Sequence, residues 1–138
     1  MKAGYQNQNT KEEYRMGQAK ESLLKMVEKI NENPKAQAVF VTNIAGKEIN
    51  WEMAFQFNLD DEGSFFLEVK NQQIAFSEGT KSDAEILMSG DTNAIVRICE
   101  GKGDFTHAIS REQITVEKGK VMDVIRLTRA ITIVLKTK

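Results

Sequence analysis

The sequence is poor in the residues that carry most catalytic and metal-binding chemistry. It has one histidine, one cysteine and one proline among 138 residues. The single cysteine, Cys99, excludes an internal disulfide, and a reducing cytoplasm is the expected location. No apolar run approaches the roughly 18 residues of a transmembrane helix, and no apolar N-terminal region typical of a signal peptide is visible. We therefore expect a cytoplasmic protein whose contact with membranes is peripheral.

The chain also lacks a large net charge, since 19 basic residues face 20 acidic ones. Nothing in this balance attracts nucleic acid, and we expect no nucleic-acid partner. The charge is unevenly spread, because residues 118–138 hold six of the basic residues and one acid. This basic C-terminal segment is a candidate for transient contact with an anionic membrane, where each charge contributes about 1 kcal/mol. A core-packing helix with a solvated basic edge is the alternative.

Residues 49–59 alternate between apolar and polar side chains without interruption. A period of two predicts a half-buried β-strand, because successive side chains point to opposite faces of a sheet. The apolar side is large and needs a cover; it consists of Ile49, Trp51, Met53, Phe55, Phe57 and Leu59.

The start of the chain predicts a tail followed by a helix. Residues 1–10 are polar and aperiodic, which is typical of a flexible tail, and residues 11–138 are expected to form a single domain. The pair Thr10 and Glu13 fits a capping box before a helix over residues 11–31. Asn33-Pro34 ends that helix. For residues 35–42 a short helix is favoured, with a strand as the alternative.

The remaining pattern predicts a sheet framed by helices. Strands are expected at residues 64–70, 73–78, 83–89 and 111–117, and helices at residues 91–100, 105–109 and 120–136. The β-branched end of the last helix, residues 131–135, could instead be extended. Close strand spacing predicts an antiparallel meander. The expected fold is α+β, with a five-stranded, mainly antiparallel sheet covered on one face by helices.

Candidate catalytic and metal-binding residues are few and isolated. His107 lacks an accompanying nucleophile motif, and Cys99 lies on an apolar helix face. The acids at residues 60–62 suit a solvated turn. The Gly-Lys-Gly at residues 101–103 lacks the remainder of a phosphate loop. We expect no metal site and no cofactor.

Adaptable apolar side chains are a more informative feature. Five methionines lie on or beside predicted inward faces: Met16, Met26, Met53, Met88 and Met122. Methionine is flexible and polarizable, so such an interior suits partners of varied shape. A solid core that contains some methionine is the alternative.

Several segments follow one another in a recognisable order. An alternating aromatic strand (INWEMAFQF) leads through an acidic turn (LDDEG) to a second aromatic strand (SFFLEV). Then come QIAFSEG, KSDAEILMSGD, AIVRICEGKGD, FTHAI and EQITVEKGKVMDVIRLTRA. Together, residues 49–129 resemble the sterol carrier protein type-2 domain family, with NENPKAQAVF similar to its second helix. Two departures are EKGK, where many members have Gly-Asp, and the lack of a Ser-Lys-Leu-type C-terminus.

The resemblance implies a non-catalytic lipid carrier with an apolar tunnel between sheet and helices. The ligand would be a sterol, a fatty acid or a fatty acyl chain, and the oligomeric state is left open. Carried over by position, the tunnel-wall candidates are Trp51, Met53, Phe55, Phe57, Phe65, Leu67, Phe76, Ile86, Met88, Ile95, Ile98, Phe105, Val121, Ile125 and Leu127. One alternative is an enzyme or enzyme subunit, such as an isomerase or hydrolase, using Glu52, Glu85 or His107 in the same cavity. Another is an interaction module whose apolar face is filled by a partner chain.

Overall fold

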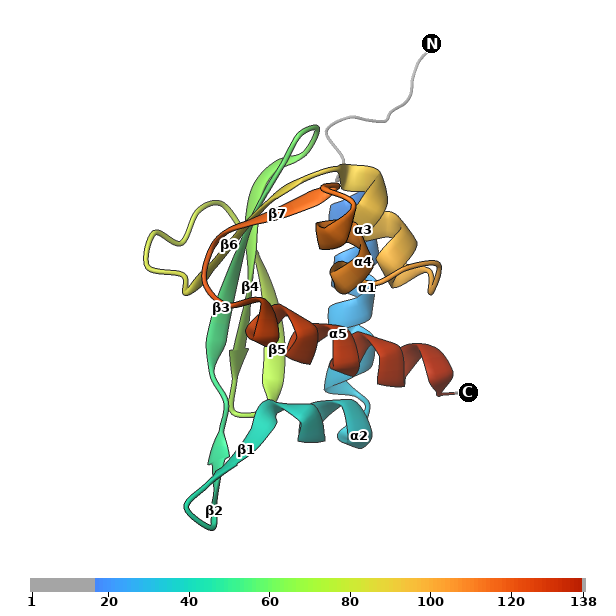
Figure 1. Cartoon of the computed structure of the whole chain (residues 1–138). Helices are drawn as coiled ribbons and strands as arrows, with labels where there is room; N and C mark the ends of the chain where they lie inside the picture. Colours follow the sequence, from blue (N-terminus) through green and yellow to red (C-terminus); the bar gives the residue numbers. More distant parts are fainter. Residues whose placement is uncertain (1–16, 138) are drawn as a thin grey trace.

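A computed structural model describes residues 17–137 of the chain. Figure 1 shows two layers, a sheet and a set of helices packed against one of its faces. The helices are α1 (Gln18–Asn31), α2 (Pro34–Gln37), the 3-10 turn η2 (Ala38–Phe40), α3 (Thr92–Cys99), α4 (Phe105–Ser110) and α5 (Val121–Lys136). The strands are β1 (Val41–Ile44), β2 (Lys47–Asn50), β3 (Met53–Leu59), β4 (Gly63–Lys70), β5 (Gln73–Glu78), β6 (Ile86–Gly90) and β7 (Ile114–Lys118). This arrangement confirms the predicted α+β fold class.

The first helix is held by a carboxylate that comes from far along the chain. At the start of α1, the Glu62 carboxylate accepts hydrogen bonds from the backbone N–H groups of Ala19, at 2.8 Å, and Lys20, at 3.0 Å. These N–H groups have no partner within the helix, so the carboxylate caps it. The prediction of a merely solvated turn at residues 60–62 was therefore wrong for Glu62. The predicted cap, Thr10 with Glu13, lies outside the described residues.

The main sheet is mixed, with strand order β5-β4-β3-β6-β7. The pairs β3–β4, β4–β5 and β6–β7 are antiparallel, whereas β3 and β6 are parallel. Three strands therefore form the predicted meander, but the fourth does not continue it. Residues 79–85 carry the chain back across the sheet so that β6 lies beside β3. A parallel crossover usually contains a helix, and this connection is much shorter.

The crossover is fixed to the outer face of the sheet by one buried side chain. Gln56 of β3 is 2% exposed. Its Nε2 donates to the carbonyl oxygens of Phe65, at 3.1 Å, and Gly79, at 3.3 Å. Its Oε1 accepts from the N–H of Lys81 at 2.7 Å. The amide thus hydrogen-bonds backbone groups of the short crossover to β3.

The predicted strand over residues 49–59 is divided in two. β2 pairs with β1 as a separate hairpin, and β3 begins at Met53. Between them, the Trp51 N–H donates to the Phe40 carbonyl at 2.8 Å. Ile49 is consequently 43% exposed, so its predicted place on the buried face was wrong. Residues 35–42 turn out to contain both a short helix and the start of β1.

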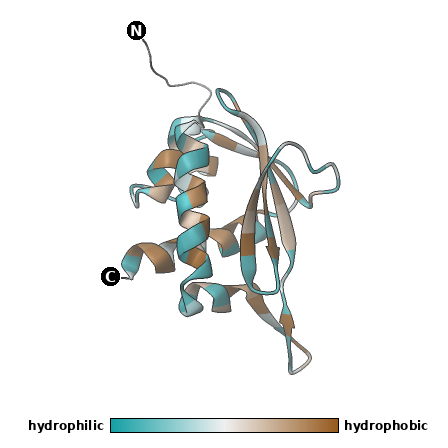
Figure 2. Cartoon of the chain, turned by 180° about the vertical axis from the view of Figure 1, so that it is seen from behind, coloured by the Kyte–Doolittle hydropathy of each residue, from teal (hydrophilic) through white to brown (hydrophobic). Residues whose placement is uncertain are grey.

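The C-terminal half follows the sequence pattern closely. Asp91 and Asp104 cap α3 and α4 by accepting from the backbone N–H groups of Asn93 and His107, at 2.9 and 2.8 Å. β7 begins three residues later than predicted. α5 remains helical to Lys136, so the extended alternative for residues 131–135 is not adopted. Figure 2 shows the two layers from behind, with hydrophobic residues along α5.

Candidate functional site

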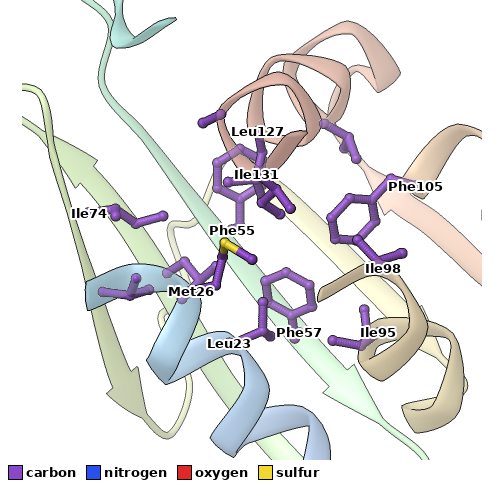
Figure 3. Packing of buried hydrophobic residues seen from close by; sticks show 14 of the residues in the cluster. Leu23, Met26, Phe55, Phe57, Ile74, Ile95, Ile98, Phe105, Leu127 and Ile131 are labelled. Carbon is purple, nitrogen blue, oxygen red and sulfur yellow. The ribbon is translucent and has the colours of Figure 1, made fainter. Parts of the chain in front are cut away.

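The space between the sheet and the helices is filled by one cluster of apolar side chains. Figure 3 shows members from α1, β3, β5, α3, α4 and α5 pointing toward one another. The labelled ones are Leu23, Met26, Phe55, Phe57, Ile74, Ile95, Ile98, Phe105, Leu127 and Ile131. We call the whole buried set, which spans residues 19–134, the interior cluster. It is the candidate site because it fills the interface between the sheet and the helices.

Four aromatic rings run across the middle of this cluster. Phe57 and Phe65 stack with centroids 5.0 Å apart and planes within 7°. Phe76 stacks on the other side of Phe65 at 5.2 Å, and Phe105 of α4 lies 6.4 Å from Phe57. The row therefore crosses β5, β4 and β3 and ends against a helix. Such rings offer a wide apolar surface with few rotatable bonds.

A second aromatic group lies at the end of β3 where the hairpin begins. Trp51 stacks on Phe40 at 5.9 Å and lies 6.0 Å from Phe55. The Arg126 guanidinium of α5 lies 5.1 Å from the Trp51 ring centroid, within cation–π range. Its Nη1 also donates to the Val39 carbonyl at 2.8 Å. One positive charge is thus held at the edge of the interior cluster.

Most of the fifteen predicted tunnel-wall residues lie in this cluster. Ten are buried members: Phe55, Phe57, Phe65, Leu67, Ile86, Met88, Ile95, Ile98, Phe105 and Leu127. Three partly buried residues pack against it: Trp51, Met53 and Phe76. The other two lie apart, because Val121 is 41% exposed and Ile125 is half-buried outside the cluster. The tunnel itself, and the contact of these residues with a ligand, stay predictions.

Some members of the cluster were missing from the predicted wall. Leu23 and Met26 come from α1, and Ile131 comes from α5. Their three- and four-residue spacing is the signal that could have placed them there. Phe40 lay in the segment whose secondary structure was ambiguous, so its side could not be assigned.

The two long helices are attached differently. At the end of α1, the Asn31 side chain donates to the Ile74 carbonyl of β5 at 2.8 Å and accepts from the Ile74 N–H at 2.9 Å. With Glu62 at its start, α1 is hydrogen-bonded to the sheet layer at both ends. α5 is bonded instead to residues 33–41, which we call the α2 segment. The bonds are made by Arg126 and by Thr137 just after the helix, whose Oγ1 accepts from Asn33 Nδ2 at 3.1 Å. Among residues 17–137, no α5 side chain hydrogen-bonds to the five-stranded sheet.

The cluster holds almost no group for acid–base chemistry. In the described part of the chain, the buried polar side chains are Gln56, which faces the crossover, and Thr92. Glu52 and Glu85 are exposed, as the alternation predicted. The His107 side chain is 67% exposed and its Nδ1 lies 3.0 Å from Asp104 Oδ1. The three residues considered for catalysis therefore lie outside the cluster.

The lone cysteine is held in its protonated form. Cys99 is partly buried on α3, and burial, followed by the neighbouring Glu100 carboxylate, raises the pKa of its thiol to about 12. The thiolate is the reactive species, so this residue is a packing side chain at neutral pH. No group of three His, Cys, Asp or Glu residues within residues 17–137 could hold a metal ion.

The helices give no sign of a membrane span. No helix between residues 17 and 137 combines the length and the hydropathy needed to cross a bilayer.

Known structures share this fold at low sequence identity. A crystal structure of sterol carrier protein 2 matches with a TM-score of 0.58 and 13% identity, over 87% of this chain and 95% of that one. A UbiJ-SCP2 ubiquinone synthesis protein matches at 0.59 and 12%, over 85% and 94%. Sterol carrier protein 2 of Aedes aegypti, in complex with the C16 fatty acid palmitate, matches at 0.53 and 16%, over 85% and 96%. Comparison with curated proteins found no match.

The family assignment rests on the sequence itself. The model of the SCP-2 sterol transfer family matches residues 27–131, which include β3–β7 and most of the helices around the interior cluster. This match covers well over half of the chain and agrees with the resemblance found in residues 49–129. The chain therefore belongs to the SCP-2 sterol transfer family.

Proposed function

We propose that this protein is a non-catalytic carrier that holds the apolar part of a lipid between its sheet and its helices. The observation that carries the proposal is the interior cluster, with its row of four rings and no buried acid or base among the described residues. Family membership supports it. So does the Aedes aegypti relative, which has the same fold and is bound to palmitate. A fatty acid, a sterol or a fatty acyl chain fits this chemistry.

Apolar burial would drive such binding. Each buried methylene contributes about 0.8 kcal/mol, so a sixteen-carbon chain gains on the order of 10 kcal/mol before ordering costs are subtracted. An apolar wall supplies this without a bond being broken. It discriminates weakly among ligands of similar size, since one methylene at about 0.8 kcal/mol changes affinity about fourfold.

The attachment of the helices supports α5 as the element that moves to admit the ligand. α1 is hydrogen-bonded at both ends to the sheet layer, whereas α5 is bonded to the α2 segment. Apolar contacts between α5 and the sheet are non-directional, so a small displacement loses little. In this proposal α5 and the α2 segment shift together and enlarge the tunnel.

The remaining parts of the proposal concern surroundings and partners. The N-terminal turn of α5 exposes Val121 at 41% and Met122 at 71%, close in sequence to Lys118 and Lys120. Apolar and basic side chains together suit brief contact with an anionic membrane, from which the carrier would collect its ligand. We place the protein in the cytoplasm, where Cys99 would remain reduced.

The deciding experiment is mass spectrometry of the protein purified without detergent. We expect released lipids in near-stoichiometric amount, and a rise in thermal stability when palmitate is returned to the stripped protein. At a ligand concentration of 100 Kd the gain is about 2.7 kcal/mol. The competing enzyme hypothesis would require turnover of the bound lipid. A folded protein that carries no lipid, and that neither palmitate nor a sterol stabilises, would refute the proposal.

A further inference from the structure

The loop between α3 and α4 borders a hollow of about 290 Å³ with a basic rim. We call it the α3–α4 pocket. Its charged and titratable residues are Arg97 of α3, Lys102 of the loop, Asp104 and His107 at α4, and Arg111 just after it. Asp104 is the one carboxylate among the lining residues. The pocket therefore gathers three permanent positive charges around one negative charge.

The nearby carboxylates lie against Lys102 and His107 and not against the two arginines. Asp104 Oδ1 accepts from the His107 backbone N–H at 2.8 Å and faces the His107 ring at 3.0 Å. The Glu100 carboxylate lies 3.6 Å from Lys102 Nζ, at the rim. Within residues 17–137, Arg97 and Arg111 form no ion pair. Guanidinium groups bind phosphate oxygens through paired N–H donors, so these two are suited to an anionic ligand.

The floor of the pocket is the outer side of the interior cluster. Ala94, Ile98 and Ala108 line the pocket and also belong to that cluster, at 2%, 2% and 4% exposure. These three residues are therefore shared by the pocket and the apolar interior. Phe105, which lies on the same short helix as Ala108, continues the aromatic row inward.

Another hollow shows what sets this one apart. A space of about 200 Å³ on the outer side of β3 and β4 is lined by both acids and lysines. There, Lys81 Nζ lies 3.3 Å from Asp83 and 3.7 Å from Glu68, so its charge is already paired. In the α3–α4 pocket, by contrast, Arg97 and Arg111 form no ion pair with the described residues, and the floor is shared with the apolar interior.

We propose that the α3–α4 pocket binds the phosphate headgroup of an anionic amphiphile whose acyl chain lies in the interior cluster. The inference rests on the proposed carrier function and names the ligand class for it. Arg97 and Arg111 hold the phosphate oxygens, and the chain passes inward beside Ile98. A carrier built this way prefers a lipid phosphate to an uncharged lipid of equal chain length.

The test compares one charged and one uncharged ligand on two matched variants. The double variant Arg97→Gln/Arg111→Gln removes the two guanidinium groups of the pocket, and Lys25→Gln/Lys47→Gln removes two exposed charges elsewhere. Lysophosphatidic acid and the monoacylglycerol of the same chain length are titrated while the fluorescence of the single tryptophan, Trp51, is recorded. We expect the affinity of the first variant for lysophosphatidic acid to fall about tenfold, and its affinity for the monoacylglycerol to stay unchanged. The control variant should bind both ligands as the unmodified protein does.

Three results would overturn the inference. The first is unchanged affinity of Arg97→Gln/Arg111→Gln for lysophosphatidic acid, and the second is an equal loss in the control variant. The third is that the amide NMR signals of the pocket residues shift with inorganic phosphate but not with lysophosphatidic acid. The pocket would then be an anion site unconnected with the interior. Failure of the carrier function itself is distinguishable, since the unmodified protein would then bind neither lipid. Urea unfolding of each variant confirms that it is folded.

Discussion

Replacing Phe55 by tryptophan asks whether the interior is rigid or yields to a ligand. Phe55 is fully buried in the middle of β3, where it pairs with Leu67 of β4 and Ile86 of β6. Figure 3 shows its ring beneath Leu127 and Ile131 of α5. A larger ring at this position must push against the helix layer, because the strands on both sides are fixed by their hydrogen bonds.

A rigid interior and a yielding one predict different changes in the free energies of unfolding and of ligand binding. In a rigid, close-packed core, overpacking by Phe55→Trp costs about 1–3 kcal/mol of the free energy of unfolding. If α5 is displaced easily, that cost falls below about 1 kcal/mol and the indole occupies space that a ligand would use. Excluding two or three methylenes then removes about 2 kcal/mol of binding free energy, or roughly thirtyfold in Kd. We expect the second outcome.

Urea unfolding and displacement of a fluorescent fatty acid measure the two quantities on one preparation. Phe66→Trp is the matched control, because the side chain of Phe66 alternates to the opposite face of β4 and is only partly buried. It should change neither quantity appreciably. A loss of 1–3 kcal/mol in stability with an unchanged Kd for Phe55→Trp would refute the reasoning, since ligand and indole would then occupy different places.

Three further predictions concern single groups. Glu62→Ala should lower the free energy of unfolding by about 1 kcal/mol in urea titrations, because α1 loses its cap. Gln56→Glu should lower it by more than about 2 kcal/mol in the same assay, since the donor to the Phe65 and Gly79 carbonyls becomes an acceptor. The thiol of Cys99 has a pKa of about 12, so about one thiol in ten thousand is ionised at pH 8 and alkylation should be slow there. The alkylation rate should then rise about tenfold per pH unit up to that pKa. Fast alkylation at pH 8 of the folded protein would show an exposed, ordinary thiol.

Local patterns explain most of what the sequence predicted correctly. Period-two alternation placed Phe55, Phe57, Phe65 and Leu67 on the covered face, because a strand has only two faces. Helix caps such as Asp91 are local features as well, since cap and helix are neighbours in sequence. Ten of the fifteen wall candidates are therefore buried members of the interior cluster.

Features that depend on distant residues were not predictable in this way. The parallel pairing of β6 with β3 requires a crossover whose backbone is hydrogen-bonded by Gln56. A lone glutamine in a strand pattern is normally interpreted as an exposed residue. Glu62 reaches back more than 40 residues to cap α1. The stacking of Arg126 on Trp51 depends on how α5 crosses the hairpin base. The break of the strand at Trp51 likewise follows from its hydrogen bond to Phe40.

The crossover on the outer face and α5 on the inner face are joined to the sheet by different forces, and this difference bears on the carrier proposal. The crossover on the outer face is held by directional hydrogen bonds centred on Gln56. α5 on the inner face meets the sheet through apolar contacts, and its polar bonds lead to the α2 segment. A directional bond is lost by a small displacement, whereas an apolar contact is weakened only as area is exposed to water or left empty. A lipid chain entering beneath α5 replaces that area with its own. In the proposed carrier, α5 would therefore open at little cost only when an apolar ligand fills the space, so opening and loading would be one step.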